Sequence, residues 1–348
     1  MFDGKRTRIN PQISWITVNR SCNLRCRWCY AEGAEYRQQK EMSLETAQML
    51  TKITKEVGVP AILLIGGEPT LWPHIFKFTR FCKNLGIKSV LVTNGLRFGN
   101  NGFWDDYCET PNDNIGLSLK AWNPEQLRKI AGSSDFEQMK LGMKRACDRF
   151  HSQIGITYNS FYQGNLTDMA RFAIDCGAKA VQINFCYTSF VDGKPISTHM
   201  VPPEELAKNI VTDYPELMKI TNGKLAFELM LPFCLFPREF IEQLKENDQI
   251  ISVCQLKKGK GLVWDENGNF MMCNALFDYP IGHYGTDFIN AQSLLNWLNS
   301  EVVLGYYNRM GAYPSEKCRK CTMYLQCGGG CPLRWAVYKP DKVVKPFN

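Results

Sequence analysis

The sequence predicts an α/β fold built on a parallel sheet, because short apolar runs rich in β-branched residues alternate with segments of helical periodicity. The runs are almost continuously apolar, which is typical of strands covered on both faces. A chain of 348 residues, 45% of them hydrophobic, can bury a full core. We therefore expect one large α/β domain followed by a smaller appendage.

Each expected element follows from this alternation. The expected strands are Ile13–Val18, Ala61–Ile65, Ser89–Thr93, Ile115–Leu119, Ile154–Tyr158 and Ala180–Phe185. The expected helices between them are Leu44–Glu56, capped by Ser43, then His74–Leu85, Pro124–Phe150 with a break at Gly132, and Leu166–Cys176. Two amphipathic helices, Pro202–Thr221 and Pro237–Asn247, are expected to flank a bridging region, Leu225–Phe236, where the first domain ends.

The most informative motif follows the first expected strand, where Cys22, Cys26 and Cys29 form a CxxxCxxC spacing. Three thiolates this close in sequence can hold three corners of a [4Fe–4S] cluster, because such clusters are ligated by cysteine sulfur. The next cysteine, Cys82, is far along the chain, so the fourth iron is expected to lack a protein ligand. The spacing alone leaves a zinc knuckle or three core cysteines open.

This motif resembles the CxxxCxxC signature of the radical SAM superfamily, and Gly66-Gly67-Glu68-Pro69 after the next strand resembles its GGEP element. The resemblance covers the first two thirds of the chain. It implies a partial (β/α)6 TIM-type barrel over residues 1–236, and a cluster whose open iron chelates S-adenosylmethionine (SAM). One electron from the cluster then cleaves SAM to a 5′-deoxyadenosyl radical, which abstracts hydrogen from the substrate.

In barrels of this kind, site residues lie at the C-terminal ends of the strands. By resemblance, the GGEP element contacts the methionine part of SAM and Tyr30 lies near the adenine. Strand ends supply the remaining candidates for holding the cofactor, namely Thr93, Asn94, Ser118 and Asn159. Such residues also commonly cap the next helix. Lys120 departs from the pattern usual after this serine. It could contact an anionic group of cofactor or substrate, but we expect it to be an exposed lysine.

Residues 237–348 carry a second group of cysteines. Cys254 and Cys273 bracket an expected hairpin with its turn at Asp265–Gly268, and a C-x2-C-x5-C-x3-C run supplies Cys318, Cys321, Cys327 and Cys331. This layout resembles the SPASM domain, which carries auxiliary iron–sulfur clusters in radical SAM enzymes that modify peptides and proteins. A zinc ribbon is the alternative, since paired CxxC elements also make tetrahedral zinc sites.

The resemblance implies one or two auxiliary [4Fe–4S] clusters, the first bound by Cys254, Cys273 and Cys331 and the second by Cys318, Cys321 and Cys327. Each set is one thiolate short, because the final cysteine of the SPASM pattern is not found. The first set could recruit Cys234 or leave an iron open; the second could use Asp341, water or a partner's residue. One cluster held by Cys254, Cys273, Cys318 and Cys321 is the alternative. We expect two clusters, because six cysteines exceed the need of one site.

Composition limits the kinds of partner and the cellular compartment that we expect for this protein. No apolar run approaches the roughly 20 residues that span a bilayer, the first residues lack the apolar core of a secretory signal, and the net charge of +7 is spread along the chain. We therefore expect no membrane and no nucleic acid partner. The chain has fifteen cysteines, and the CxxC-type grouping among them indicates metal or cluster binding in a reducing, cytoplasmic compartment. The four histidines lie away from the motifs, which argues against acid–base hydrolysis.

By resemblance, the expected function is a peptide maturase: an enzyme that abstracts hydrogen from a residue of a ribosomally made precursor peptide. Auxiliary clusters suit an oxidative outcome, such as a cross-link, a thioether or backbone excision, more than epimerisation. Epimerisation needs a hydrogen donor, for which Cys186 and Cys234 are the candidates.

Cys22 lies close to the first residue, so we expect leader recognition by a separate small protein or by the SPASM domain, with flavodoxin or ferredoxin as electron donor. The alternative enzymes are a sulfatase-maturing type or a sugar dehydrogenase. The non-enzymatic alternative is a zinc- or cluster-stabilised binding module.

Overall fold

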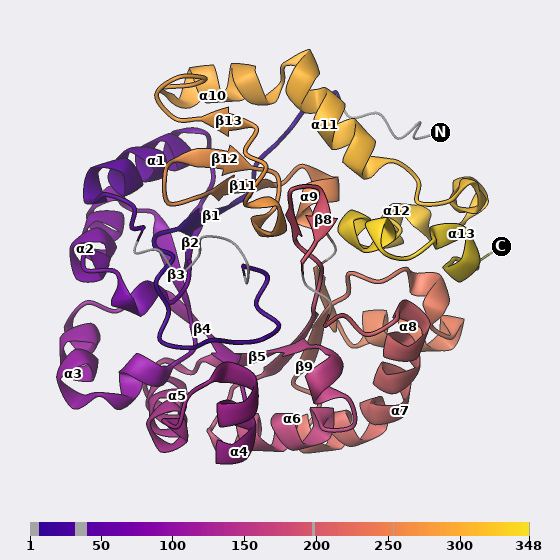
Figure 1. The fold of residues 1–348 in the computed structure, drawn as a ribbon, viewed down its shortest axis with the longest axis horizontal. Coiled ribbons are helices and arrows are strands. Elements are labelled where there is room, and N and C mark those ends of the chain that lie inside the picture. The colour runs from indigo at the N-terminus through magenta and orange to yellow at the C-terminus, as the bar shows by residue number, and fades with distance from the viewer. Residues whose placement is uncertain (1–6, 32–39, 197–198, 253, 348) are drawn as a thin grey trace.

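The computed structural model describes residues 7–31, 40–196, 199–252 and 254–347. The first six residues, part of the argument against a signal sequence, and Asn348, the end of the second expected domain, lie outside them. Figure 1 shows a curved wall of strands with helices packed around its outer face. The loop that follows β1 crosses the open end of this wall in the same view.

The six expected strands form the centre of the sheet, side by side and parallel, each within one residue of its expected bounds. Among the described residues this sheet has 11 strands, in the order β10-β9-β6-β5-β4-β3-β2-β1-β11-β12-β13. The central six are β1 (Ile13–Thr17), β2 (Ala61–Ile65), β3 (Lys88–Thr93), β4 (Asn114–Leu119), β5 (Gln153–Tyr158) and β6 (Val181–Phe185).

The sheet continues beyond these six strands on both sides, which the sequence did not lead us to expect. At one side, β9 (Leu225–Glu228) pairs parallel with β6, and β10 (Ile250–Ser252) pairs with β9. At the other, β11 (Gly261–Trp264) pairs parallel with β1. Strands of three or four residues are too short to show periodicity. The sequence therefore predicts a bridging region between domains, and not a strand, at the position of β9. The boundary at residue 236 stays a prediction, and the sheet runs across it.

The expected hairpin is present, because β11 pairs antiparallel with β12 (Asn269–Met271). On its other side, β12 pairs antiparallel with β13 (Gly282–His283). Gly268 in the turn has φ +80°, a conformation that glycine adopts without strain. A separate two-stranded ribbon, β7 (Phe190–Val191) with β8 (Lys194–Pro195), follows β6.

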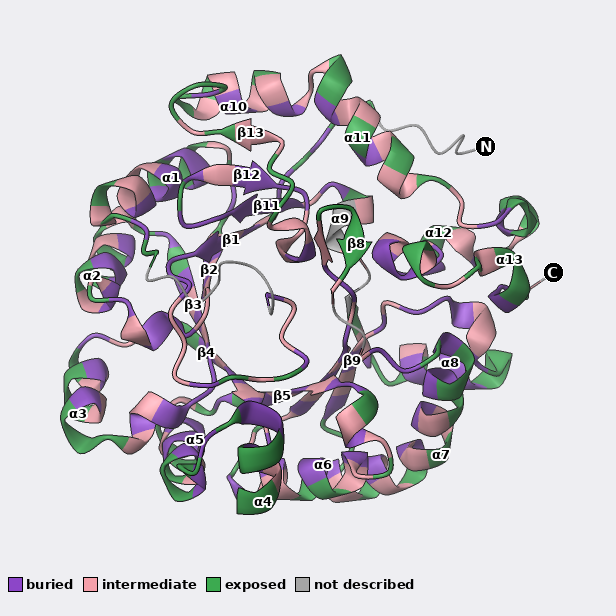
Figure 2. Cartoon of the chain, viewed as in Figure 1, coloured by how far each residue is buried: buried purple, intermediate pink, exposed green. Residues whose placement is uncertain are grey.

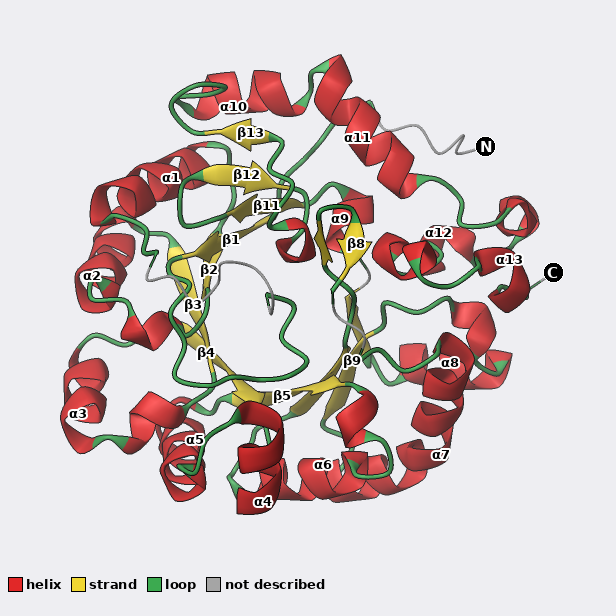
Figure 3. Ribbon diagram, in the orientation of Figure 1, coloured by secondary structure: helices red, strands yellow, loops and turns green. Residues whose placement is uncertain are grey.

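The helices cover the outer face of the strands (Figure 3). The expected long third helix breaks at Gly132, which has φ +67°; a π-helical turn, Leu127–Ala131, precedes the break. Helix α3 was not expected. The barrel helices are α1 (Leu44–Glu56), α2 (Ile75–Leu85), α3 (Asn101–Glu109), α4 (Pro124–Gln126), α5 (Phe136–Phe150), α6 (Leu166–Asp175), α7 (Pro203–Thr221) and α8 (Arg238–Glu246). Those that follow are α9 (Gln255–Lys258), α10 (Ala291–Leu298), α11 (Glu301–Gly311), α12 (Tyr324–Cys327) and α13 (Pro340–Val343).

The core lies between the sheet and these helices (Figure 2). Ile16, Ile62, Leu64 and Leu91, from three adjacent strands, are completely buried. Ser43 caps α1 as expected, with its side chain accepting a hydrogen bond from the backbone of Thr46. No helix in the described part of the chain is long and apolar enough to cross a membrane. This packing fixes the strand ends, and the loops that follow them form the candidate site.

Candidate active site

The CxxxCxxC loop follows β1 and is held against the π-helical turn. The backbone N–H groups of Arg25 and Arg27 donate to the carbonyls of Ala131, at 2.7 Å, and Ile130, at 2.9 Å. Within the loop, the N–H of Leu24 donates to the Cys22 sulfur at 3.4 Å. These hydrogen bonds fix the backbone of the cysteine loop relative to the π-helical turn.

Burial raises the pKa of two of the three thiols. The pKa of Cys22 rises to about 11, through burial and then the neighbouring Glu68 carboxylate. The pKa of Cys26 rises to about 12 through burial, and the charge of Lys120 opposes that rise. Because iron binds thiolates, cluster assembly here must release these protons.

The two glycines of the GGEP element pack against this loop. The N–H of Gly67 donates to the Asn19 carbonyl at 2.9 Å, and that of Glu68 to the Ser21 carbonyl at 2.7 Å. A Cβ atom on Gly66 would lie 2.5 Å from the Asn19 carbonyl oxygen, and one on Gly67 would lie 2.1 Å from the Ser21 oxygen. Both positions therefore need glycine for the contact between the two loops. Their contact with SAM stays a prediction.

Glu68 is 1% exposed and joins the loops after β2 and β3. Its Oε1 atom accepts hydrogen bonds from the Thr70 N–H, at 3.1 Å, the Thr70 hydroxyl, at 2.8 Å, and the Thr93 hydroxyl, at 2.7 Å. Its Oε2 atom accepts from the Asn94 N–H at 2.8 Å. The Asn94 side chain in turn donates to the Asn23 side chain of the cysteine loop at 2.8 Å. Thr93 and Asn94 thus position Glu68, whatever they contact in a bound cofactor.

Lys120 faces the site and is not the exposed lysine we expected. It is half-buried; its Nζ atom donates to the Ser118 hydroxyl at 2.7 Å and lies 4.8 Å from the ring centroid of Trp28. The Tyr162 hydroxyl donates to the Lys120 carbonyl at 2.8 Å and accepts from the Trp28 indole at 3.1 Å. Lys120 therefore places a positive charge near Cys22 and Cys26.

Asn159 and Pro69 have clear local roles. The Asn159 side chain is fully buried, accepts from the Phe161 N–H at 2.9 Å, and caps the 3-10 helix Ser160–Tyr162. Pro69 begins the 3-10 helix Pro69–Leu71, where its missing N–H is not needed. A contact of either residue with SAM stays a prediction.

Tyr30 lies beside a tyrosine that the sequence did not single out, Tyr187, with ring centroids 6.3 Å apart. Burial raises the pKa of Tyr30, and the nearby Cys29 and Cys273 raise it further. Burial also raises the pKa of Tyr187, to which Cys273 and Cys331 add. The tyrosine pair is therefore within electrostatic reach of both the CxxxCxxC motif and the first auxiliary set.

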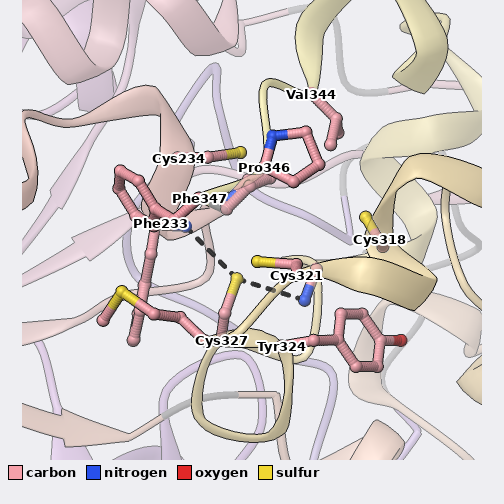
Figure 4. A pocket seen from close by; sticks show the side chains of 12 residues that line it. Phe233, Cys234, Cys318, Cys321, Tyr324, Cys327, Val344, Pro346 and Phe347 are labelled. Atoms are coloured by element: carbon pink, nitrogen blue, oxygen red, sulfur yellow. Dashed lines mark hydrogen bonds between the residues drawn. The ribbon is translucent and has the colours of Figure 1, made fainter.

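The structure separates Cys234 and the six cysteines of the C-terminal region into two groups. Burial raises the pKa of Cys254, and Cys331 and Cys273 raise it further, so these three lie together. Burial likewise raises the pKa of Cys234 to about 11, and its thiol neighbours are those of the second set. The second group lines one cavity (Figure 4): Cys234, Cys318, Cys321 and Cys327. This grouping favours two clusters over one shared by Cys254, Cys273, Cys318 and Cys321.

Cys186 and Cys234, the two hydrogen-donor candidates, lie apart. Cys186 follows β6, where its thiol lies 3.8 Å from the Tyr187 carbonyl and its own carbonyl accepts from Arg334 at 2.9 Å. Arg334 is 1% exposed and also donates to the Val201 carbonyl at 3.2 Å. A buried arginine cannot be distinguished from an exposed one by sequence pattern, so Arg334 was missed. The donor roles of both cysteines stay predictions.

The cysteine thiols are the side chains that could hold iron–sulfur clusters in this chain. Among the described residues, no three His, Cys, Asp or Glu side chains are grouped closely enough to hold one metal ion. A cubane is ligated at separate irons, so its cysteines need not meet at one point. The residues that could hold such groups are Cys22, Cys26 and Cys29 near the strand ends, and the two cysteine groups of the C-terminal region.

Comparison with solved structures shows the same fold in two enzymes. The structure of Streptococcus suis SuiB bound to the precursor peptide SuiA is 20% identical, covers 97% of this chain and 75% of that one, and has a TM-score of 0.68. The structure of anSMEcpe with bound AdoMet and the Cp18Cys peptide is 17% identical, covers 92% and 89%, and has a TM-score of 0.61. At these identities the similarity is one of fold.

Curated sequences similar to this chain include the probable GTP 3′,8-cyclase of Methanocaldococcus jannaschii, 28% identical over 49% of this chain and 57% of that protein. Another is the probable GTP 3′,8-cyclase of Thermococcus kodakarensis, 26% identical over 47% and 53%. The chain spans about half the length of these curated relatives. Residues 16–171 match the family model described as the Radical SAM superfamily, a span that contains both the CxxxCxxC and GGEP motifs. By this match, residues 16–171 are similar to the radical SAM superfamily.

Proposed function

We propose that this protein abstracts hydrogen from a residue of a ribosomally made precursor peptide and so begins an oxidative modification of that peptide. Cys22, Cys26 and Cys29 would hold a [4Fe–4S] cluster. When bound, this cluster and SAM supply a 5′-deoxyadenosyl radical. The C-terminal cysteines would hold auxiliary clusters, and a flavodoxin or ferredoxin would supply electrons.

One observation carries the proposal: the rings of Tyr30 and Tyr187 are neighbours, and the pair lies within electrostatic reach of both Cys29 and the set of Cys273 and Cys331. A substrate radical formed near Tyr30 would thus arise close to a second site able to accept an electron. Oxidative bond formation needs such an acceptor, whereas simple hydrogen return does not. This proximity favours oxidation over epimerisation.

The protein's own residues supply orientation and charge. The Glu68 network holds the loops after β1, β2 and β3 in one arrangement through the chain's own hydrogen bonds. Lys120 offers a cation for an anionic group of cofactor or substrate. Preorganised groups of this kind cost little reorganisation when the reaction occurs.

The comparisons support a peptide but leave a second candidate. The two solved structures compared above each contain a peptide, by their descriptions. The similar curated sequences are instead named for a nucleotide reaction, the GTP 3′,8-cyclases. A cyclase-like reaction on a nucleotide is therefore the second candidate.

Anaerobic assays with two substrates distinguish these candidates. The reconstituted, reduced enzyme is given SAM together with either GTP or synthetic peptides encoded by short reading frames beside its gene. We expect 5′-deoxyadenosine to form faster in the presence of one peptide. When that peptide is labelled with deuterium, the deuterium should appear in the 5′-deoxyadenosine, and the mass of the peptide should change. Product from GTP alone would overturn the peptide proposal. The variant Cys22→Ala/Cys26→Ala/Cys29→Ala is the control and should not cleave SAM.

A further inference from the structure

We infer that Cys234 is the fourth thiolate ligand of a [4Fe–4S] cluster held by Cys318, Cys321 and Cys327. This inference rests on the auxiliary-cluster part of the proposed function and completes one of its two cysteine sets. The sequence leaves that set one ligand short and allows Cys234 to serve the first set instead. The structure places Cys234 with the second set.

The cavity that carries the inference joins segments far apart in the chain. Cys234 lies in the 3-10 helix Phe233–Leu235, shortly after β9, whereas the other three cysteines lie nearly a hundred residues later. Figure 4 shows all four thiols around this cavity. Its other lining residues are Pro232, Phe233, Met323, Tyr324, Gly329, Val344, Pro346 and Phe347. Among the described residues of this lining there is no carboxylate and no imidazole, so thiols are its metal-binding groups.

Backbone N–H groups around this cavity donate hydrogen bonds to two of its sulfur atoms. The Cys327 sulfur accepts from the N–H of Phe233, at 3.2 Å, and from that of Gly329, at 3.3 Å. The Cys234 sulfur accepts from the Lys345 N–H at 3.4 Å. Backbone N–H donors aimed at sulfur favour the thiolate and tune a bound cluster. The Phe233 bond also links the residue next to Cys234 directly to Cys327.

The other ligands that the sequence allowed fit less well. Asp341 is exposed on α13, and it does not line the cavity. The first set lies elsewhere, since the thiol neighbours of Cys254 are Cys273 and Cys331. A cluster with four thiolates has no open iron, so this one would relay electrons and would not bind substrate. The first set, with three thiols, keeps the position where substrate could bind iron.

Differential alkylation tests the ligation without altering the chain. Reconstituted protein and protein stripped of iron are each treated anaerobically with iodoacetamide and analysed by peptide mass spectrometry. We expect Cys234 to be labelled at least tenfold less in the iron-loaded protein, in parallel with Cys318. Cys108 on α3 should be labelled equally in both. Equal labelling of Cys234 in both states, with Cys318 protected, would overturn the inference.

Iron analysis separates ligation from shielding. In the Cys22→Ala/Cys26→Ala/Cys29→Ala background, which retains only auxiliary clusters, we expect about 8 irons per chain. Adding Cys234→Ala should lower this to about 4, or change the electron paramagnetic resonance of the reduced cluster. Cys327→Ala should have the same effect, and Cys108→Ala should have none. Unchanged iron and an unchanged spectrum would refute the role of Cys234. A background without iron would instead refute the auxiliary clusters themselves, and the inference with them.

Discussion

Arg20 and Glu266 form a buried ion pair, with Nε and Oε2 2.7 Å apart and side chains only 7% and 6% exposed. Arg20 lies just before the CxxxCxxC motif, and Glu266 lies in the turn between β11 and β12. The pair therefore ties the loop that carries the three cysteines to the hairpin of the C-terminal region. It also explains how β11, added beside β1, is fixed relative to the active site.

The first prediction follows from this burial. Glu266→Ala leaves the Arg20 guanidinium buried without a partner, and we expect a loss of about 3 to 5 kcal/mol in the free energy of unfolding. The matched control is Glu242→Ala, which breaks the exposed Arg238–Glu242 pair on α8 and should cost less than about 1 kcal/mol. Urea denaturation monitored by circular dichroism measures both. Equal losses in the free energy of unfolding would show that the buried pair contributes no more to stability than the exposed one.

Gly67 tests the contact between the GGEP and cysteine loops. In Gly67→Ala the new Cβ would lie 2.1 Å from the Ser21 carbonyl oxygen and 2.6 Å from that of Arg20, both of them backbone atoms that cannot move aside cheaply. We expect the cysteine loop to shift and SAM cleavage to fall by about 100-fold. Gly102→Ala on α3 meets its nearest atom at 3.7 Å and serves as control. Full activity in Gly67→Ala would contradict the packing argument.

Glu68 tests the hydrogen-bond network. In Glu68→Gln an amide NH₂ replaces one carboxylate oxygen. It then faces either the Asn94 N–H, or the Thr70 N–H together with the hydroxyls of Thr70 and Thr93. Leaving a buried donor unpaired should cost about 1 to 3 kcal/mol of stability. We also expect SAM to bind more weakly, measured by calorimetry on the reconstituted protein. Thr93→Ser keeps the hydroxyl that donates to Glu68, so it should lose only about 1 kcal/mol of stability for the deleted buried methyl group and should weaken SAM binding less than Glu68→Gln does.

The sequence predicted the six central strands better than the limits of the sheet. Short motifs with fixed spacing located the cysteines, and the alternation of elements predicted β1 to β6 to within one residue. The pairing of β11 with β1 joins segments more than two hundred residues apart, and local periodicity carries no signal for such contacts.

Within the site too, some residues can be found from a sequence motif, whereas others can be found only from the folded structure. Glu68 was predicted by its motif, but Glu266 was missed because an acidic residue in a turn is ordinarily solvated. Lys120 was expected to be exposed, because its half-buried position depends on Trp28 and Ser118, which only the folded chain brings beside it.

Lys257 on α9 provides the last prediction, because its charge lies near both groups of C-terminal cysteines. Its Nζ atom donates to the Gly328 carbonyl at 2.6 Å. Burial lowers the pKa of Lys257, while Cys254, Cys327 and Cys331 raise it, which places all three thiols within electrostatic reach. A reduced cluster carries one more negative charge than an oxidised one, so a nearby cation favours reduction.

Removing this charge should therefore make both auxiliary clusters harder to reduce. We expect Lys257→Met to lower their midpoint potentials by roughly 40 mV, the equivalent of about 1 kcal/mol for a one-electron couple. Lys258→Met, which removes an exposed charge from the same helix, should shift the potentials by less than half as much, because solvent screens it. Redox titration followed by electron paramagnetic resonance measures both variants. Equal shifts would mean that the position of Lys257 between the cysteine groups has no electrostatic consequence.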